Sequence, residues 1–234
     1  MKKVFWDNPY QHTLTTKVAS VHGNQVLFEE TIAYSFAGGQ ESDTAHVNGI
    51  PLLDSKREEN LIYYTLPENH LGFASSFAEQ AKLPFKVGDT VTMTIDWPRR
   101  SNLMRLHFAA ELILEIVTQN YHLEKIGAHI AQTKSRIDFI SPENISPLLE
   151  PILAEYNEII KKDLPIHKGY SDLETQRRFW KIDGFAQVPC GGTHVNSTGE
   201  VGFVTLKRDR VGKNKERIEI RLVDDTPLSP REPL

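Results

Sequence analysis

Cysteine is almost absent from the sequence. Among the 234 residues, Cys190 is the single cysteine. A lone cysteine excludes a framework of intramolecular disulfides and is typical of a protein from a reducing compartment. No stretch approaches the ~18 consecutive apolar residues that a membrane-spanning helix needs. The two lysines near the start are not followed by the apolar run of a secretory signal. Together these absences predict a cytoplasmic protein without a membrane span.

An excess of positive charge is absent as well. The 27 lysine and arginine residues are outnumbered by 31 aspartate and glutamate residues, so the formal net charge is −4 at pH 7. This balance excludes a basic coat over the whole chain of the kind that binds nucleic acid, although it permits a local basic patch. Hydrophobic residues make up 39% and charged residues 25%, as in a globular protein, and the length suits one or two domains.

The first 97 residues have the pattern of a small β-barrel. Short segments with period-two alternation are separated by turn residues, and Asn48-Gly49 is a strong hairpin signal. Five or six short strands without a long helical pattern predict a barrel, so we assign residues 1–97 to a β-barrel domain with a glycine-rich motif. One short helix over residues 74–82 is expected to interrupt the strands. The clearest strand candidates are residues 13–21, 25–34, 61–66 and 91–97.

The pattern changes after residue 97. Apolar residues then recur at helical spacing, which predicts a helix over residues 101–119 with Ser101 as its N-cap. A second helix is expected near residues 151–162, and the capping-box pattern of Ser171 to Glu174 predicts a further helix start. The fold class is therefore α+β, with a barrel followed by an α+β domain over the rest of the chain. Strands of that second domain are expected at residues 202–210 and 217–223, within the range 98–234.

Two polar residues lie on the apolar face of the first predicted helix. His107 and Glu111 are four residues apart, about one turn, so both side chains project from the same face as Leu103 and Leu114. Polar groups within an apolar stripe cost free energy unless a partner satisfies them. They are either a core histidine with a partner and a glutamate at the edge of the stripe, or two ligands of a metal.

A second pair lies in a turn with the sequence Cys190-Gly-Gly-Thr-His194. Glycines permit tight or left-handed backbone, so such a turn can direct both side chains to one point. The alternative is a buried cysteine beside a surface histidine. With His107 and Glu111 the pair gives one thiolate, two imidazoles and one carboxylate, a set that suits zinc, whereas soft sulfur disfavours magnesium and calcium. We therefore predict that these four residues bind Zn²⁺.

At these motifs the chain resembles the stand-alone alanyl-tRNA editing proteins of the AlaX family, and it is similar also to the editing domain of alanyl-tRNA synthetase. The resemblance covers about residues 5–223, and the length is that of the medium-sized members. The chain departs from the family at Glu111, where the family has a second helix histidine. The residues that carry the resemblance are Cys190 to Val195 with Thr198 to Gly202, Met104 to Ala110, Gly38-Gly39-Gln40 with Asp43, and Gln132 with Arg136 to Phe139.

The resemblance implies hydrolysis of the ester that links a wrong amino acid, serine first and glycine second, to the 3′ end of tRNA(Ala). It implies Zn²⁺ as the cofactor, Gln132 and Thr193 as catalytic residues, and substrate binding by Thr31. Thr31 matches a family threonine linked to the serine hydroxyl, and a pocket built to bind a hydroxyl can reject alanine. From the residues alone, Gln132 is a surface glutamine and Thr31 a strand threonine chosen for its β-propensity. The other substrate-binding residues implied are Gly38, Gly39 and Gln40.

A local basic segment lies near the end of the chain. Residues 207–221 carry seven lysines and arginines against three acidic residues. We expect this segment to contact the tRNA, because affinity for RNA depends on neutralised phosphates. The alternative is a hairpin whose charges are only solvated. The predicted RNA-binding residues are Lys207, Arg208, Arg210, Lys213 and Lys215.

Two other functions stay open at this point. Glu111 in the place of a histidine favours a metal-free RNA-binding module derived from an editing domain. A zinc hydrolase that acts on a small ester or amide is the third hypothesis. We place it last, because the helix lacks the His-Glu-x-x-His arrangement in which a glutamate serves a zinc protease as its base.

Overall fold

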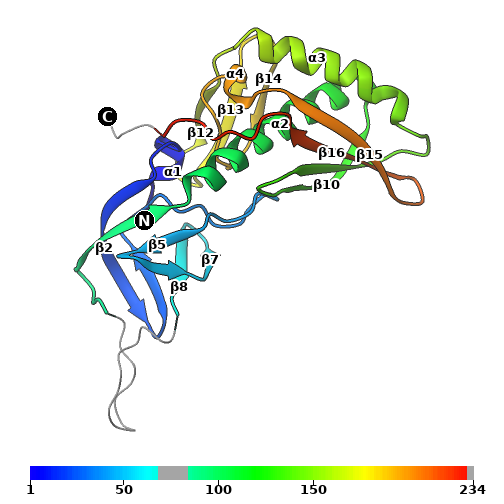
Figure 1. Cartoon of the computed structure of the whole chain (residues 1–234). Helices are drawn as coiled ribbons and strands as arrows, with labels where there is room; N and C mark the ends of the chain where they lie inside the picture. Colours follow the sequence, from blue (N-terminus) through cyan, green and yellow to red (C-terminus); the bar gives the residue numbers. More distant parts are fainter. Residues whose placement is uncertain (68–83, 231–234) are drawn as a thin grey trace. The chain divides into compact units, whose positions relative to one another are not determined.

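The computed structural model describes residues 1–67 and 84–230, and the short helix predicted over residues 74–82 lies outside these ranges. The chain forms two compact units, whose elements are shown in Figure 1. In the parts of the chain that are described, no helix has the length and apolar character needed to cross a membrane. That the units are separate domains with a boundary after residue 97 stays a prediction. The first unit comprises Met1–Phe36, Ser42–Arg99 and Ser229–Leu234, and the second comprises Ala37–Glu41 and Arg100–Leu228.

The first unit is built on an antiparallel, barrel-like sheet. Among its described residues this sheet has seven strands in the order β6-β5-β9-β2-β3-β8-β7. The predicted small N-terminal β-structure is therefore confirmed. A separate parallel pair joins β1 to β4. The elements are β1 (Lys2–Lys3), α1 (Val4–Asp7), β2 (Thr13–His22), β3 (Gln25–Phe28), β4 (Glu30–Thr31), β5 (Ala45–Val47), β6 (Ile50–Leu52), β7 (Asp54–Glu58), β8 (Leu61–Thr65) and β9 (Thr90–Ile95).

Alternation along the strands explains this sheet. In the first half of β2 and throughout β9 every second residue is buried, so one face of each strand points to the interior. Asn48 and Gly49 have positive φ angles of 48° and 81°, as a two-residue hairpin between β5 and β6 requires. The hairpin predicted there is therefore confirmed. Fully buried members of the core are Phe5, Val26, Phe28, Ile62 and Met93.

The long helix α2 (Trp97–Tyr121) contains the first predicted helix but begins four residues before Ser101. Asp96 caps it, because its Oδ1 accepts a hydrogen bond from the backbone N–H of Arg99 at 3.1 Å. Pro98 falls in the first turn, where the missing N–H of a proline has no helical partner to lose. Ser101 lies inside the helix, fully buried, and its Oγ accepts a backbone hydrogen bond. The prediction of Ser101 as the N-cap was therefore wrong.

The second unit combines helices with two antiparallel sheets. Within its described residues one sheet has the order β10-β11-β16-β15 and the other the order β12-β13-β14. The helix near residues 151–162 and the two late strands are confirmed within about two residues. The elements are β10 (Glu124–Ile130), β11 (Ser135–Ile140), the 3-10 turn η2 (Ser146–Leu148), α3 (Leu149–Lys161), β12 (His167–Asp172), β13 (Arg177–Ile182), β14 (Ala186–Pro189), α4 (Thr198–Val201), β15 (Val204–Gly212) and β16 (Lys215–Leu222).

Within the second unit, α2 packs on the four-stranded sheet. Leu103 and Leu106 of the helix form a buried cluster with Ile130 of β10. Ser135 Oγ, at the start of β11, donates a hydrogen bond to the carbonyl of Leu106 at 3.1 Å. These contacts fix the rotation of α2 about its axis and therefore the direction in which its polar residues point.

The segment after β12 is a turn where a helix start was predicted. Asp172 Oδ1 accepts hydrogen bonds from the backbone N–H groups of Glu174 and Thr175, at 2.9 and 3.1 Å. Gln176 then takes a positive φ of 53°, and the chain continues as β13. The capping-box prediction was wrong, because an aspartate side chain that can cap a helix can equally close a turn.

The glycine-rich segment, expected in the first domain, belongs to the second unit. Gly39 accepts a hydrogen bond from Ile130 N at 2.8 Å, and Glu41 N donates to Ile130 O at 3.0 Å. A Cβ atom on Gly39 would lie 2.7 Å from the carbonyl oxygen of Ala128, and its φ is 91°. Only glycine fits such an approach to β10. The segment is therefore fixed to the sheet that packs against α2, and its assignment to the first domain stays a prediction.

Candidate metal centre

The four predicted ligand side chains lie together in the second unit. Cys190 Sγ lies 3.5 Å from His107 Nε2 and 3.3 Å from His194 Nε2. Glu111 Oε1 lies 3.3 Å from His107 Nε2 and 3.8 Å from Cys190 Sγ. The donor atoms of His107, Cys190 and His194 all lie within 4.8 Å of one another. Two pairs that are 83 positions apart in the sequence are therefore in contact.

Two elements deliver these side chains. The helix α2 presents the first pair from adjacent turns, and the loop after β14 presents the second. The β13–β14 hairpin leads into this loop, and a hydrogen bond from Cys190 N to Arg178 O at 3.0 Å extends it to the cysteine. Lys168 Nζ holds the other end of the loop, since it donates to the carbonyls of His194 and Val195, both at 3.3 Å. The loop is thus fixed at both ends.

The spacing and chemistry of the cluster fit a zinc ion. In a tetrahedral site with bonds of about 2.0–2.3 Å, neighbouring ligand atoms are about 3.3–3.8 Å apart. The contacts of Cys190 with His107 and His194, at 3.5 and 3.3 Å, lie within this range, and Glu111 Oε1 approaches His107 and Cys190 at 3.3 and 3.8 Å. Glu111 is outside the group whose ligand atoms all lie within 4.8 Å of one another. One sulfur, two imidazole nitrogens and a carboxylate oxygen are ligands that zinc accepts. The residues present therefore fit Zn²⁺, with His107, Cys190 and His194 as the most compact part of the site.

Gly192 allows the loop to approach α2. A Cβ atom at this position would lie 2.0 Å from Cε1 and 2.3 Å from Nδ1 of His107. No side chain fits there without movement of the histidine. The sequence suggested glycines for backbone freedom in this turn, but at Gly192 the structural requirement is close approach.

Gln40 supports His107 through the ring nitrogen that does not contact Cys190. Its Oε1 lies 2.7 Å from His107 Nδ1 and accepts a hydrogen bond from Thr193 N at 3.1 Å, while its Nε2 donates to Thr193 Oγ1 at 2.9 Å. Because this oxygen is an acceptor, His107 Nδ1 carries the proton and Nε2 faces the cluster. The structure thus joins Gln40, predicted to bind substrate, to Thr193, predicted to be catalytic. Both of those roles stay predictions.

Charges within the cluster are strongly coupled. Burial lowers the pKa of His107, but the adjacent Cys190 and Glu111 outweigh this effect and raise the pKa to about 10. Burial, followed by the positive charge of His107, holds the pKa of His194 well below its ordinary value. The same acceptor and acidic groups would attract a divalent cation, which the ligands would bind in their deprotonated forms.

Trp180 is a partner of the cluster that the sequence did not reveal. Its Nε1 donates a hydrogen bond to Glu111 Oε2 at 2.9 Å, and the residue is fully buried. The indole packs edge-on against Phe108, with ring centroids 5.1 Å apart, and Phe108 packs in turn against His194 at 5.6 Å. A tryptophan 69 positions from the glutamate it binds belongs to no local motif.

The remaining predicted site residues have diverse surroundings. Gln132 is half-buried in the turn between β10 and β11. Gly38, whose φ is 59°, has open space where a Cβ would be. Thr31, in β4 of the first unit, is fully buried, and its Oγ1 is 2.7 Å from Tyr64 Oη and accepts a hydrogen bond from Ala33 N at 3.1 Å. The catalytic role of Gln132 and the substrate-binding roles of Gly38, Gly39 and Thr31 stay predictions.

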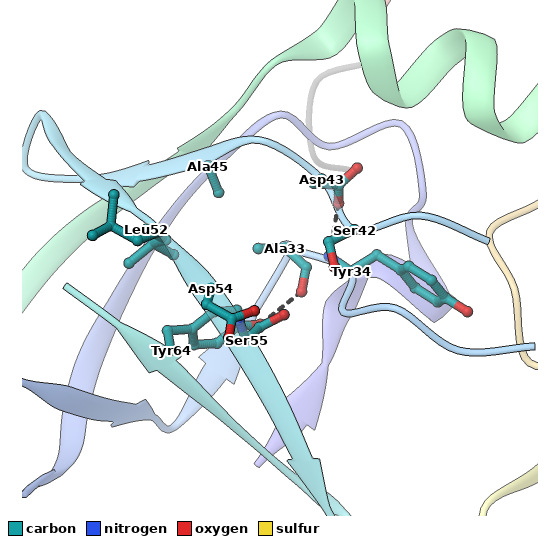
Figure 2. A pocket seen from close by; sticks show the side chains of 10 residues that line it. Ala33, Tyr34, Ser42, Asp43, Ala45, Leu52, Asp54, Ser55 and Tyr64 are labelled. Atoms are coloured by element: carbon teal, nitrogen blue, oxygen red, sulfur yellow. Dashed lines mark hydrogen bonds between the residues drawn. The ribbon is translucent and has the colours of Figure 1, made fainter. Parts of the chain in front are cut away.

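A pocket opens in the first unit, and Figure 2 shows the side chains around it. Asp43 Oδ2 accepts a hydrogen bond from Tyr34 N at 2.7 Å, and Tyr64 Oη donates to Ala33 O at 2.6 Å. The wall of the pocket is thus held together by hydrogen bonds between side chains and the backbone. Since Tyr64 also contacts Thr31, the predicted substrate-binding threonine lies one hydrogen bond from this wall.

The basic segment forms the β15–β16 hairpin. Arg208 makes a bidentate ion pair with the buried Glu216, with Nε–Oε2 and Nη2–Oε1 distances both 2.6 Å. The charge of Arg208 is therefore compensated within the hairpin. Binding of RNA by this segment stays a prediction for all five residues. Those with exposed side chains are Lys207, Arg210, Lys213 and Lys215.

The chain is similar in sequence to known tRNA synthetases. The family model for the second additional domain of threonyl and alanyl tRNA synthetases matches residues 178–219, a range that contains the cysteine–histidine loop and much of the basic hairpin. The fold and site thus define a chain related to the accessory domains of these synthetases. The alanine–tRNA ligase of Methanococcus maripaludis (strain C5) is 27% identical over 92% of this chain, which spans only 25% of that ligase.

Two alanyl-tRNA editing proteins of Pyrococcus horikoshii are similar over nearly the whole chain. AlaX-M is 30% identical, and the alignment covers 94% of this chain and 97% of that protein. AlaX-L is 26% identical over 94% of this chain and 57% of its own length. The chain belongs to the AlaX family of alanyl-tRNA editing proteins.

Proposed function

We propose that this protein is a trans-editing hydrolase that deacylates mischarged tRNA(Ala), with serine as the main wrong amino acid and glycine as the second. The observation that carries the proposal is the compact cluster of His107, Cys190 and His194, with Glu111 in contact with His107 and Cys190, in a chain of this family. These four residues would hold the ion. When bound, zinc supplies Lewis-acid polarisation of an ester carbonyl.

The chain's own residues prepare the site for this reaction. Gln40 holds His107 in one tautomer and is tied to Thr193 by two hydrogen bonds. Hydrolysis breaks the bond between the amino acid's carbonyl carbon and a ribose oxygen, and water supplies the oxygen of the new carboxylate and the proton of the new hydroxyl. We propose that Gln132 contacts the ester and that Thr193 completes the catalytic set. Both positions are polar and lie in the unit that holds the cluster.

Discrimination against the correct product is assigned to Thr31, with Gly38, Gly39 and Gln40 also assigned to substrate binding. A pocket that hydrogen-bonds a serine hydroxyl can reject alanine by ~10⁴–10⁵, since alanine leaves the buried polar group unpaired. Contact with tRNA is assigned to the exposed cations of the β15–β16 hairpin, because phosphate contacts dominate nucleic-acid affinity.

The test is deacylation of Ser-tRNA(Ala) and Ala-tRNA(Ala) by the zinc-loaded protein and by the Cys190→Ala variant. The wild type should hydrolyse the serine ester and spare the alanine ester, and the variant should lose about 10²-fold or more in rate, as expected when a main electrostatic group is removed. Gln187→Ala is the matched control, since this exposed residue lies on β14 three positions before the thiol. Equal rates for wild type and Cys190→Ala would refute a role of the metal site in catalysis.

A metal-free RNA-binding module is the second candidate, and one observation favours it. Only three of the four predicted ligands, His107, Cys190 and His194, belong to the group of described residues whose ligand atoms all lie within 4.8 Å of one another, so Glu111 completes the set less closely. Elemental analysis of the purified protein, before and after incubation with zinc, separates the two functions. Stoichiometric zinc supports the hydrolase, whereas RNA binding without zinc uptake supports the module.

A further inference from the structure

We propose that Trp180 is a positioning residue of the metal centre, which ties up one carboxylate oxygen of Glu111 so that only the other oxygen is presented to the metal. The inference deepens the proposed function and rests on it, because it concerns the same zinc site. It also gives a reason for the hydrogen bond between Glu111 on α2 and the buried Trp180.

The two oxygens of Glu111 have separate partners. Oε2 accepts the Trp180 Nε1 hydrogen bond at 2.9 Å. Oε1 lies 3.3 Å from His107 Nε2 and 3.8 Å from Cys190 Sγ, on the side of the ligand cluster. A carboxylate can bind a metal through one oxygen or through both. The Trp180 hydrogen bond occupies one lone pair of Oε2 and fixes the rotation of the carboxylate, and both effects favour the one-oxygen mode.

The indole is held firmly enough to impose this choice. Trp180 is fully buried, and its ring meets Phe108 at an interplanar angle of 65°. Its backbone pairs with Val188 in the β13–β14 hairpin, and the same hairpin ends at Cys190. The N–H donor and the thiol are therefore carried by one rigid hairpin, while α2 supplies the carboxylate between them.

The chemistry of Glu111 and Trp180 explains why the effects of the two residues on metal binding should be coupled. A hydrogen bond from a partner outside the ligand set orients a metal ligand, and its loss commonly lowers metal affinity about 10–100-fold. An imidazole at position 111 would not offer the two oxygen acceptors of a carboxylate. The contribution of the indole N–H should therefore depend on the glutamate.

This dependence gives the test, which is Trp180→Phe in the wild type and in Glu111→His. Phenylalanine keeps an aromatic ring against Phe108 but removes the N–H. Zinc affinity is measured by competition with a chelator of known affinity, and coordination is followed by the visible absorption spectrum of the Co²⁺-loaded protein. In the wild-type background we expect zinc affinity to fall about 10–100-fold, with weaker visible bands as the second oxygen joins the ion. In Glu111→His the same change should alter affinity by no more than about twofold.

Trp97→Phe, a matched change in the first unit, should leave both measurements unaltered. The proposal is overturned if Trp180→Phe weakens zinc binding equally in both backgrounds, because a merely structural role would do that. It is also overturned if neither affinity nor spectrum changes. A wild type that takes up no metal defeats this inference together with the zinc site. If the coupling is found but Ser-tRNA(Ala) is not deacylated, the proposed function fails and the positioning role stands.

Discussion

At residue 192 the absence of a side chain decides whether the loop can reach α2. We predict that Gly192→Ala displaces His107, because the new Cβ would lie 2.0 Å from its Cε1. Zinc affinity should fall at least about tenfold, and the free energy of unfolding should decrease by about 1–3 kcal/mol. Chelator competition and urea unfolding measure the two effects. Gly127→Ala is the control, since its Cβ would make an ordinary 3.5 Å contact with Asp138, and similar losses in both variants would contradict the argument.

Asp138 on β11 is a second residue whose surroundings lead to a testable prediction. Burial raises the pKa of this carboxyl, but the hydrogen bonds from Arg217, at 2.6 and 3.0 Å, and the charge of Arg136 outweigh burial and lower it. A lowered folded-state pKa means that the carboxylate stabilises the fold above its unfolded value of about 3.9, and that this stabilisation is lost as pH falls through the folded value.

We therefore predict that Asp138→Asn lowers the free energy of unfolding at pH 7 by about 1.5–3 kcal/mol, the range for hydrogen bonds to charged groups. The gap between variant and wild type should shrink as pH drops below about 4. Urea unfolding at a series of pH values measures this gap. Glu174→Gln, at an exposed turn position, should show neither effect, and a gap that is constant with pH would exclude the carboxylate as its source.

At the scale of elements, the β15–β16 hairpin is the part of the chain we expect to bind RNA. The double variant Lys213→Ala/Lys215→Ala should weaken tRNA binding and flatten the plot of log affinity against log salt by about one unit for each phosphate that is no longer neutralised. Binding is measured at several salt concentrations. Lys161→Ala/Lys162→Ala, which removes two exposed lysines at the end of α3, is the control. An unchanged slope would show that the hairpin charges are only solvated.

Elements with strong local signals could be predicted from the sequence, whereas those set by distant partners could not. Asn48-Gly49 has a backbone preference that selects its own hairpin. By contrast, Asp172 can cap a helix or close a turn, and pairing between β12 and β13 decides for the turn. The candidate ligands were visible as two local pairs. Their support by Gln40 and Trp180 was not, because those hydrogen bonds span 67 and 69 positions.

At the scale of the whole molecule, we expect that binding of the metal stabilises the folded second unit. A ligand that binds only the folded state, at a free concentration of about 1,000 times its dissociation constant, stabilises a protein by about 4 kcal/mol. For a chain of this size that corresponds to a Tm change of about 10 °C. We predict that a chelator lowers the Tm of the zinc-loaded protein by about this amount in a calorimetric scan. The Tm of Cys190→Ala should not change with the chelator. An equal Tm of the wild type with and without the chelator would refute stabilisation by the metal.

The separation of the ligand pairs also has a consequence during synthesis of the chain. His107 and Glu111 leave the ribosome before Cys190, which follows His107 by 83 positions. At about 5–20 residues per second the interval is about 4–17 s. Throughout that time the nascent helix displays an imidazole and a carboxylate without the thiolate that completes the set. The proposed zinc site can therefore be completed only after translation has passed the hairpin that carries the thiol, so we expect tight zinc binding by the finished second unit and not by its first helix.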